Sequence, residues 1–401
     1  MKTQKTLSKR LSIILFALIL IIINSIIVSP IYGQVIRTED IIKKMLVHYP
    51  GGISCIASTD DVLLVARETH KQVLILNVET GDILGLLNCH TKPIEVMAAS
   101  PMAGLAATVD QKRKEIFFWD ISTGQSIKSF KNKRKIKSLA FSPDGKKLAI
   151  GENKGTISIF DISSWKVTRK LSIGKEDIAG ILLELPKGEF DKIEFSPLGR
   201  YLTAQNGESI FIWDLVEKNP VNIHCGIDVP PSKFVSGYYK DSQFTHDEKY
   251  LLMSGGYKQY IFDEEWILYV YEMRGYLFLK NMNSGEVDTM FTSMPISSTL
   301  FTESDTKVFL EVFIPPSPGT LPFPNLKGSY RLLVYPIESI LNGQLSGNIP
   351  AVELATTAWI YFKNKSIFVD FLHDTLYSWK FDENRPVYDE GIPIESIIQS
   401  E

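Results

Sequence analysis

His90 and Asp110 are residues of the types that form the acid–base pair of hydrolytic enzymes. Such a pair acts on a nucleophile held beside it, and no recognisable nucleophile motif accompanies these two residues in the sequence. The six histidines and three cysteines of the chain also lack the spacing of metal ligands. We therefore expect a structural role for His90 and Asp110, with no catalytic residues, no metal site and no cofactor.

A second group of residues has the chemistry to bind anions. Basic residues crowd residues 128–137, and a further basic triplet lies shortly before them. Solvated loops explain such runs, and an anionic partner is the sharper alternative because the chain as a whole has a formal net charge of −3. The candidate partner-binding residues are Lys112, Arg113, Lys114, Lys131, Lys133, Arg134, Lys135 and His224.

The elements that must position these residues are clearest between Ile136 and Asp161. Alternating apolar residues are interrupted by Ser142-Pro143-Asp144-Gly145, which predicts a tight turn because Pro presets φ and Gly tolerates positive φ. A second apolar run ends in another turn at Asn153-Lys154-Gly155, and a third run ends on Phe160-Asp161. The pattern predicts three antiparallel strands joined by short hairpins.

This order of strands and turns resembles the WD40 repeat, whose third strand usually ends in Trp-Asp. The first-strand landmark recurs at Ala57, Ala99, Phe141, Phe195, Phe244, Phe301 and Tyr361. The third-strand endings are Leu76-Asn77, Trp119-Asp120, Phe160-Asp161, Trp213-Asp214, Leu279-Lys280, Tyr335-Pro336 and Trp379-Lys380. Both landmarks give seven units, so the resemblance implies an all-β, seven-bladed WD40-like β-propeller over residues 34–385.

The resemblance also implies a role for the residues named first. His90, Thr108, Asp110 and Trp119 fall near the positions at which WD40 repeats place a hydrogen-bonded His, Ser/Thr, Asp and Trp. We expect a buried imidazole fixed by the carboxylate and the hydroxyl, with the indole N–H bonded at the end of the network.

A propeller of repeats needs a closing contact between its first and last units. The segment from Ile41 to Val47 precedes the first unit and is spaced like a fourth strand. We expect it to pair beside Ser378 to Phe381, which would complete the seventh blade.

Loop lengths are unevenly distributed along the predicted blades. The insertions Ser172 to Phe190 and Glu217 to Lys240 are assigned to connections between blades, and Ser254 to Gly275 and Pro315 to Gly328 to second-to-third-strand hairpins. In a WD40-like blade these two classes share one face, and a purely structural propeller has no evident reason to segregate its loop lengths. We therefore expect that face, which also carries the basic residues, to bind a partner.

The N-terminus has the pattern of a targeting segment. Four basic residues within the first ten precede an apolar stretch over residues 11–28, and a plausible cleavage site follows Gly33. We expect residues 1–33 to be a signal peptide, with a membrane anchor at residues 11–28 as the alternative. Loss of four basic and no acidic residues shifts the formal charge from −3 to −7, which disfavours nucleic-acid binding.

Three cysteines, Cys55, Cys89 and Cys225, are too few for a disulfide framework, and residues 386–401 have the composition of a tail. The sequence therefore predicts an exported, monomeric, non-catalytic interaction or scaffolding propeller. The alternative is a propeller enzyme or a cofactor-binding propeller, of a lactonase-like, quinone-dependent or haem-dependent kind.

Overall fold

A computed structural model of the chain describes the residues from Tyr32 to Lys380 with gaps. The described ranges are 32–36, 44–48, 53–67, 70–88, 90–172, 189–206, 209–216, 223–225, 235–262, 268–292, 295–302, 305–314, 329–342, 349–354, 359–362, 367–372 and 375–380. The expected signal peptide, apart from Tyr32 and Gly33, and the expected tail at residues 386–401 lie outside them.

The described strands form seven sheets, which we number in chain order. Sheet 1 contains β3 (Ile53–Ser58), β4 (Val62–Arg67), β5 (Val73–Asn77) and β6 (Ile83–Leu87). Sheet 2 contains β7 (Ile94–Ser100), β8 (Leu105–Asp110), β9 (Glu115–Asp120) and β10 (Ser126–Lys131). Sheet 3 contains β11 (Ile136–Phe141), β12 (Lys147–Glu152), β13 (Thr156–Asp161) and β14 (Lys166–Ser172). Sheet 4 contains β15 (Lys192–Phe195), β16 (Tyr201–Gln205), β17 (Ile210–Asp214) and β18 (Ile223–Cys225).

The remaining sheets include both N-terminal strands. Sheet 5 contains β19 (Val235–Phe244), β20 (Tyr250–Phe262), β21 (Leu268–Asn281) and β22 (Val287–Thr292). Sheet 6 contains β23 (Ile296–Phe301), β24 (Lys307–Ile314), β25 (Ser329–Pro336), β26 (Ile349–Leu354) and β1 (Tyr32–Ile36). Sheet 7 contains β27 (Trp359–Phe362), β28 (Ile367–Leu372), β29 (Thr375–Lys380) and β2 (Lys44–His48).

Local side-chain chemistry explains why the third strands of sheets 2 and 3 end in an aromatic–Asp pair. Asp120 Oδ1 accepts hydrogen bonds from the Ser122 hydroxyl and from the Thr123 backbone N–H, at 2.6 and 2.9 Å. Gly124 follows at φ 68°, a conformation that glycine adopts without strain. The carboxylate therefore closes the turn into the fourth strand, and Asp161 does the same in sheet 3 through the Ser164 N–H at 2.7 Å.

The hydrophobic core lies between successive sheets. One cluster joins sheets 1 and 2 through Leu64, Ile75, Ala106 and Trp119. Similar clusters join sheets 2 and 3, 3 and 4, 4 and 5, and 5 and 6. Because each four-stranded sheet has two apolar faces, stacking against two neighbours is what removes both from water.

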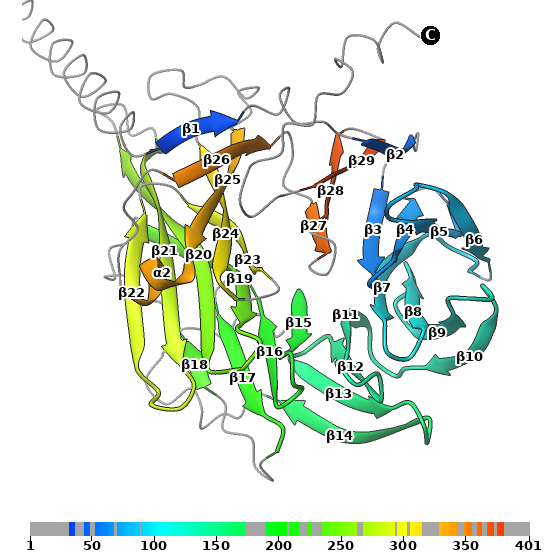
Figure 1. The fold of residues 1–401 in the computed structure, drawn as a ribbon. Helices are drawn as coiled ribbons and strands as arrows, with labels where there is room; N and C mark the ends of the chain where they lie inside the picture. The colour runs from blue at the N-terminus through cyan, green and yellow to red at the C-terminus, as the bar shows by residue number, and fades with distance from the viewer. Residues whose placement is uncertain are drawn as a thin grey trace, which may run out of the picture.

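Figure 1 shows the sheets arranged around a common centre, with β27 and β28 between sheets 6 and 1. The expected closing pair is present, since β2 pairs antiparallel with β29 and Lys44 lies opposite Ser378. The sequence did not predict β1, which pairs in parallel with β26 and places Val35 opposite Ala351. Segments far apart in the chain thus complete sheets 6 and 7.

Some predicted loop boundaries were wrong. The segment Glu217 to Lys240 is not a plain connection, because it contains β18 and the first six residues of the long inner strand β19. The hairpin insertion predicted over Ser254 to Gly275 is present as the extended pair of β20 and β21. A short helix, α2 (Ile337–Leu341), was not predicted. Residues 173–188 and 315–328 of the other two insertions lie outside the described residues.

Candidate functional site

His90 lies in the connection between β6 and β7 and is part of a buried hydrogen-bonded group. Its Nε2 is 2.6 Å from Thr108 Oγ1, and the Trp119 indole Nε1–H donates to the same oxygen at 2.7 Å. Three of the four expected network residues are therefore joined through one hydroxyl. The fourth, Asp110, accepts the backbone N–H of Lys112 at 3.0 Å.

The surroundings of His90 suit a structural imidazole. The residue is 6% exposed, and no described atom bonds its Nδ1. Burial lowers the pKa of His90 below its ordinary value of 6.5, although the charges of Asp110 and Glu115 act in the opposite direction. The ring packs edge-on against Phe117 at a centroid distance of 4.6 Å. A neutral, enclosed ring of this kind is out of reach of a substrate from solvent.

The described cysteine does not offer a reactive thiol either. Burial raises the pKa of Cys55 to about 12, so the thiolate is scarce at neutral pH. The side chains of Cys89 and Cys225 lie outside the described part of the structure. Within the described residues there is also no cluster of three or more potential metal ligands.

The strand meander places loops of two classes at each end of the sheets. We call one end the loop face: it holds the connections between sheets and the hairpins between second and third strands. The opposite end, the turn face, holds the first-to-second and third-to-fourth hairpins. Backbone hydrogen bonds join neighbouring loops at each end. On the loop face the Ile136 N–H donates to Arg113 O at 2.9 Å, and on the turn face the Ile121 N–H donates to Gly104 O at 2.9 Å.

The basic residues gather on the loop face where sheets 2 and 3 meet. Lys114 O accepts the Asn132 N–H at 2.8 Å, which brings the β8–β9 hairpin against the β10–β11 connection. The basic patch comprises Lys112, Arg113, Lys114, Lys131, Lys133, Arg134 and Lys135. The two clusters seen in the sequence therefore form one surface.

The cations of this basic patch differ in how firmly they are held. Arg113 forms a salt bridge with Glu95. Arg134 bonds Thr156 Oγ1 at 2.6 Å and lies 3.6 Å from the buried carboxylate of Glu152. Lys112 and Lys114 donate to Thr91 Oγ1 and to the Lys133 carbonyl, at 3.3 and 2.9 Å.

By contrast, the ammonium groups of Lys131, Lys133 and Lys135 have no partner among the described residues, and all three side chains are exposed. Two flanking cations are already engaged: Lys128 lies 4.9 Å above the Trp165 ring, and Lys137 pairs with Glu189 at 2.5 Å. Three amines therefore remain to meet an anion.

The other histidines of the chain are only partly within the described residues. His70 is exposed, whereas the side chains of His48 and His224 and the whole of His373 lie outside the description. The backbone of His224 belongs to β18, opposite Phe211. His246 lies on the turn face, where its Nδ1–H donates to Asp305 Oδ1 at 2.9 Å.

The turn face is built from hairpins that touch one another. Glu248 Oε1 accepts the Leu198 N–H at 2.8 Å, linking the hairpins of sheets 4 and 5. The His246–Asp305 pair links sheets 5 and 6. Gly145 comes so close to the sheet 2 hairpin that a Cβ there would lie 2.8 Å from Ala103 Cβ. Short turns on this face are thus fixed by direct packing.

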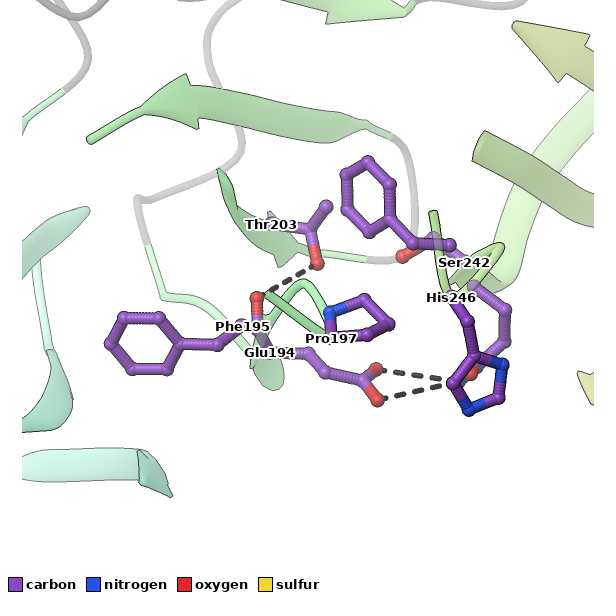
Figure 2. Close-up of a pocket in the computed structure, with 8 residues that line it drawn as sticks. Glu194, Phe195, Pro197, Thr203, Ser242 and His246 are labelled. Atoms are coloured by element: carbon purple, nitrogen blue, oxygen red, sulfur yellow. Dashed lines mark hydrogen bonds between the residues drawn. The ribbon is translucent and has the colours of Figure 1, made fainter. Parts of the chain in front are cut away.

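A pocket of about 250 Å³ opens on the turn face between sheets 4 and 5. Figure 2 shows the Glu194 side chain extending toward His246, while the Phe195 ring points the other way. The pocket is lined by Glu194, Phe195, Pro197, Thr203, Ser242, Gln243, Phe244 and His246. Sequence analysis missed this site because its two walls come from separate repeats.

Parts of this chain are similar in sequence to proteins with WD40 repeats. Residues 107–184 match the family described as "Anaphase-promoting complex subunit 4 WD40 domain". The chain is 27% identical over 171 residues to a Periodic tryptophan protein 2 homolog of Dictyostelium discoideum, covering 40% of this chain and 18% of that protein. It is 31% identical over 109 residues to Eukaryotic translation initiation factor 3 subunit I of Aspergillus terreus, covering 26% and 32%.

These relatives are similar over limited regions. The chain spans 13 to 18% of the length of the four Periodic tryptophan protein 2 relatives that it matches. A chain of Kuenenia stuttgartiensis hydrazine synthase superposes with a TM-score of 0.58 and 13% identity, covering 83% of this chain and 96% of that one. At this identity the superposition shows the likeness of fold alone.

Proposed function

We propose that this chain, which belongs to the WD40-repeat family, is a seven-bladed, exported interaction propeller that binds an anionic protein partner through the basic patch on its loop face. The WD-repeat relatives support a protein-interaction role, because propellers of this kind present broad surfaces on a rigid ring. The pairing of β2 with β29 supports closure of that ring.

The observation that carries the choice of surface is the set of three unpaired amines in the basic patch. Lys131, Lys133 and Lys135 project from one connection, and the neighbouring hairpin adds Lys112 and Lys114. The protein has a formal net charge of −3, so the basic patch is a local field of opposite sign to the whole. Such a field steers an acidic surface toward the basic patch and speeds association at low ionic strength.

Export is proposed from the basic and then apolar N-terminus. Cleavage after Gly33 would leave Val35 and Ile36 in register with β26, so β1 would lose only Tyr32 and Gly33. Mass spectrometry of the protein from its native host should find a chain that begins near Gln34. Recovery of the intact Met1 form in the membrane fraction would replace secretion with anchoring.

The binding face is tested by reversing the three unpaired charges together, Lys131→Glu, Lys133→Glu and Lys135→Glu. A matched control reverses three exposed lysines elsewhere, Lys146→Glu, Lys147→Glu and Lys166→Glu, with the same change in net charge. A labelled deca-glutamate peptide serves as a defined acidic probe in fluorescence anisotropy, beside quantitative pull-down from the exported fraction.

We expect the first variant to lose probe binding at least about tenfold, since close charge pairs contribute on the order of 1 kcal/mol each when partly screened. The control should keep the affinity of the unaltered chain for the probe. Raising the salt concentration should weaken the probe binding of the unaltered chain and of the control, which is the binding that the first variant has lost. Equal losses in both variants would refute the loop face as the binding surface.

A further inference from the structure

The pocket on the turn face differs in charge from the basic patch on the loop face. Its walls come from β15, β16 and β19 and from the hairpins that follow β15 and β19. At about 250 Å³ it is smaller than the roughly 300 to 1,000 Å³ of clefts that enclose a whole drug-sized ligand. A pocket of this size suits one side chain of a partner.

Oxygen acceptors belong to three of the side chains that line the pocket, Glu194, Ser242 and Gln243. The Gln243 amide Nε2 lies 3.4 Å from each carboxylate oxygen of Glu194. The amide oxygen of Gln243 is therefore turned away from that carboxylate, and it has no partner among the described atoms. The Asp305 carboxylate only accepts, so His246 Nδ1 carries the proton of that hydrogen bond. Glu194 adds its remaining lone pairs.

The charges beside the pocket leave a negative excess. Lys192 Nζ lies 3.0 Å from Glu194 Oε2 and 2.6 Å from Asp241 Oδ1, so one ammonium is shared between two carboxylates. Asp241 is buried and is otherwise satisfied by the Ser298 hydroxyl and the Thr299 N–H, both at 3.0 Å. The exposed share of the excess charge therefore falls on Glu194, whose side chain is 38% exposed.

We propose that this pocket binds the guanidinium group of an arginine side chain from an extended segment of a partner protein. A planar group with five N–H donors matches several acceptors set around one cavity, whereas a lysine ammonium offers three donors at a single point. Pro197 and Phe244 supply apolar wall for the methylene stem. The inference concerns the turn face and does not depend on the basic patch.

The test uses two capped pentapeptides, Ala-Ala-Arg-Ala-Ala and the same peptide with citrulline in place of arginine. Citrulline keeps the shape of the side chain but has no charge. Isothermal titration with the full chain should show saturable binding of the arginine peptide and at least about tenfold weaker binding of the citrulline peptide, as expected for loss of charge-assisted hydrogen bonds. A lysine pentapeptide should also bind less tightly than the arginine peptide. Equal affinity for the arginine peptide and either of the others would overturn the proposal.

Variants assign the binding to the pocket. Glu194→Gln should weaken the arginine peptide about tenfold, because the charge is lost while the shape is kept. The control Glu286→Gln removes an exposed carboxylate from a hairpin of sheet 5 on the same face and should leave affinity unchanged. If Glu194→Gln fails to fold, Gln243→Leu removes one acceptor and should weaken binding by a smaller factor. Unchanged affinity in a folded variant at either position would exclude the pocket as the site.

Discussion

On the turn face each described first hairpin of sheets 4, 5 and 6 is bonded to its neighbour, whereas on the loop face three lysines of the basic patch meet no described partner. The two ends of the same sheets therefore differ in what limits their loops. On the turn face a longer or bulkier hairpin would displace the next one. On the loop face the backbone of the β10–β11 connection is also hydrogen-bonded to its neighbour, but the side chains of Lys131, Lys133 and Lys135 are exposed.

This difference modifies the interpretation of loop length. From the sequence, short turns opposite long loops suggested function alone, because a structural propeller had no evident reason to segregate them. The contact of Gly145 with Ala103 and the bond from Leu198 to Glu248 supply such a reason for the short side. Long loops remain a criterion for a binding face, but the short turns are explained by packing.

The largest expected effect is on the turn face, at Gly145. Gly145→Ala adds a Cβ at φ 68° and only 2.8 Å from Ala103 Cβ. Left-handed strain and overpacking together should lower the free energy of unfolding by about 2 to 4 kcal/mol. Chemical denaturation followed by tryptophan fluorescence measures this change in the free energy of unfolding.

The matched control for that change is Gly104→Ala, also on the turn face. Gly104 has φ 61° and no atom within 4 Å of an added Cβ. The Gly104→Ala variant should therefore be destabilised by the backbone strain alone, with a free energy of unfolding lower by about 1 kcal/mol. If both variants lost the same amount, packing between hairpins would contribute nothing and the comparison of faces would fail.

A smaller effect is expected at Asp305, which accepts the N–H and the Nδ1–H of His246 at 2.6 and 2.9 Å. Asp305→Asn keeps a residue that tolerates the φ of 53° but removes the charge and one acceptor. Because the pair is partly exposed, we expect a loss of about 1 kcal/mol in unfolding free energy. Asp288→Asn, at an exposed position in β22, serves as the control and should be neutral.

Beneath the exposed loops, the buried His90 makes stability depend on pH. Its folded pKa lies below the ordinary 6.5, so the unfolded chain binds the proton more readily. The stabilisation is complete above about pH 6.5 and is lost as the pH falls from there through the folded pKa. Denaturation from pH 7.5 to 5 should therefore show a steeper decline for the unaltered chain than for His90→Gln. Parallel declines would contradict a buried neutral imidazole.

Local chemistry made much of the fold predictable from sequence. Asp120 and Asp161 close turns with their own carboxylates, so the aromatic–Asp pairs of sheets 2 and 3 mark the ends of their third strands. Strand β18 was missed because three residues carry too little periodicity, and β1 was missed because its partner β26 lies far along the chain.

The candidate sites also differ in whether neighbouring residues or distant segments of the chain form them. The basic patch was predictable because its cations are adjacent in sequence, although the division between held and unpaired amines was not. The bonding of Asp110 to Lys112 in place of His90 depends on side-chain geometry within a hairpin, which residue types do not specify. The turn-face pocket needs Glu194 and Gln243 from different sheets, a relation that only the packed structure supplies.

The smallest expected effect separates binding from stability on the loop face. Lys131→Gln, Lys133→Gln and Lys135→Gln together remove three like charges that no described residue neutralises. Unfolding free energy should change by less than about 0.5 kcal/mol, since exposed charges away from packed features contribute little. The same variant should lose the salt-sensitive binding of the deca-glutamate probe. A large loss of stability would mean that the lysines hold sheets 2 and 3 together, and the loop face would then resemble the turn face.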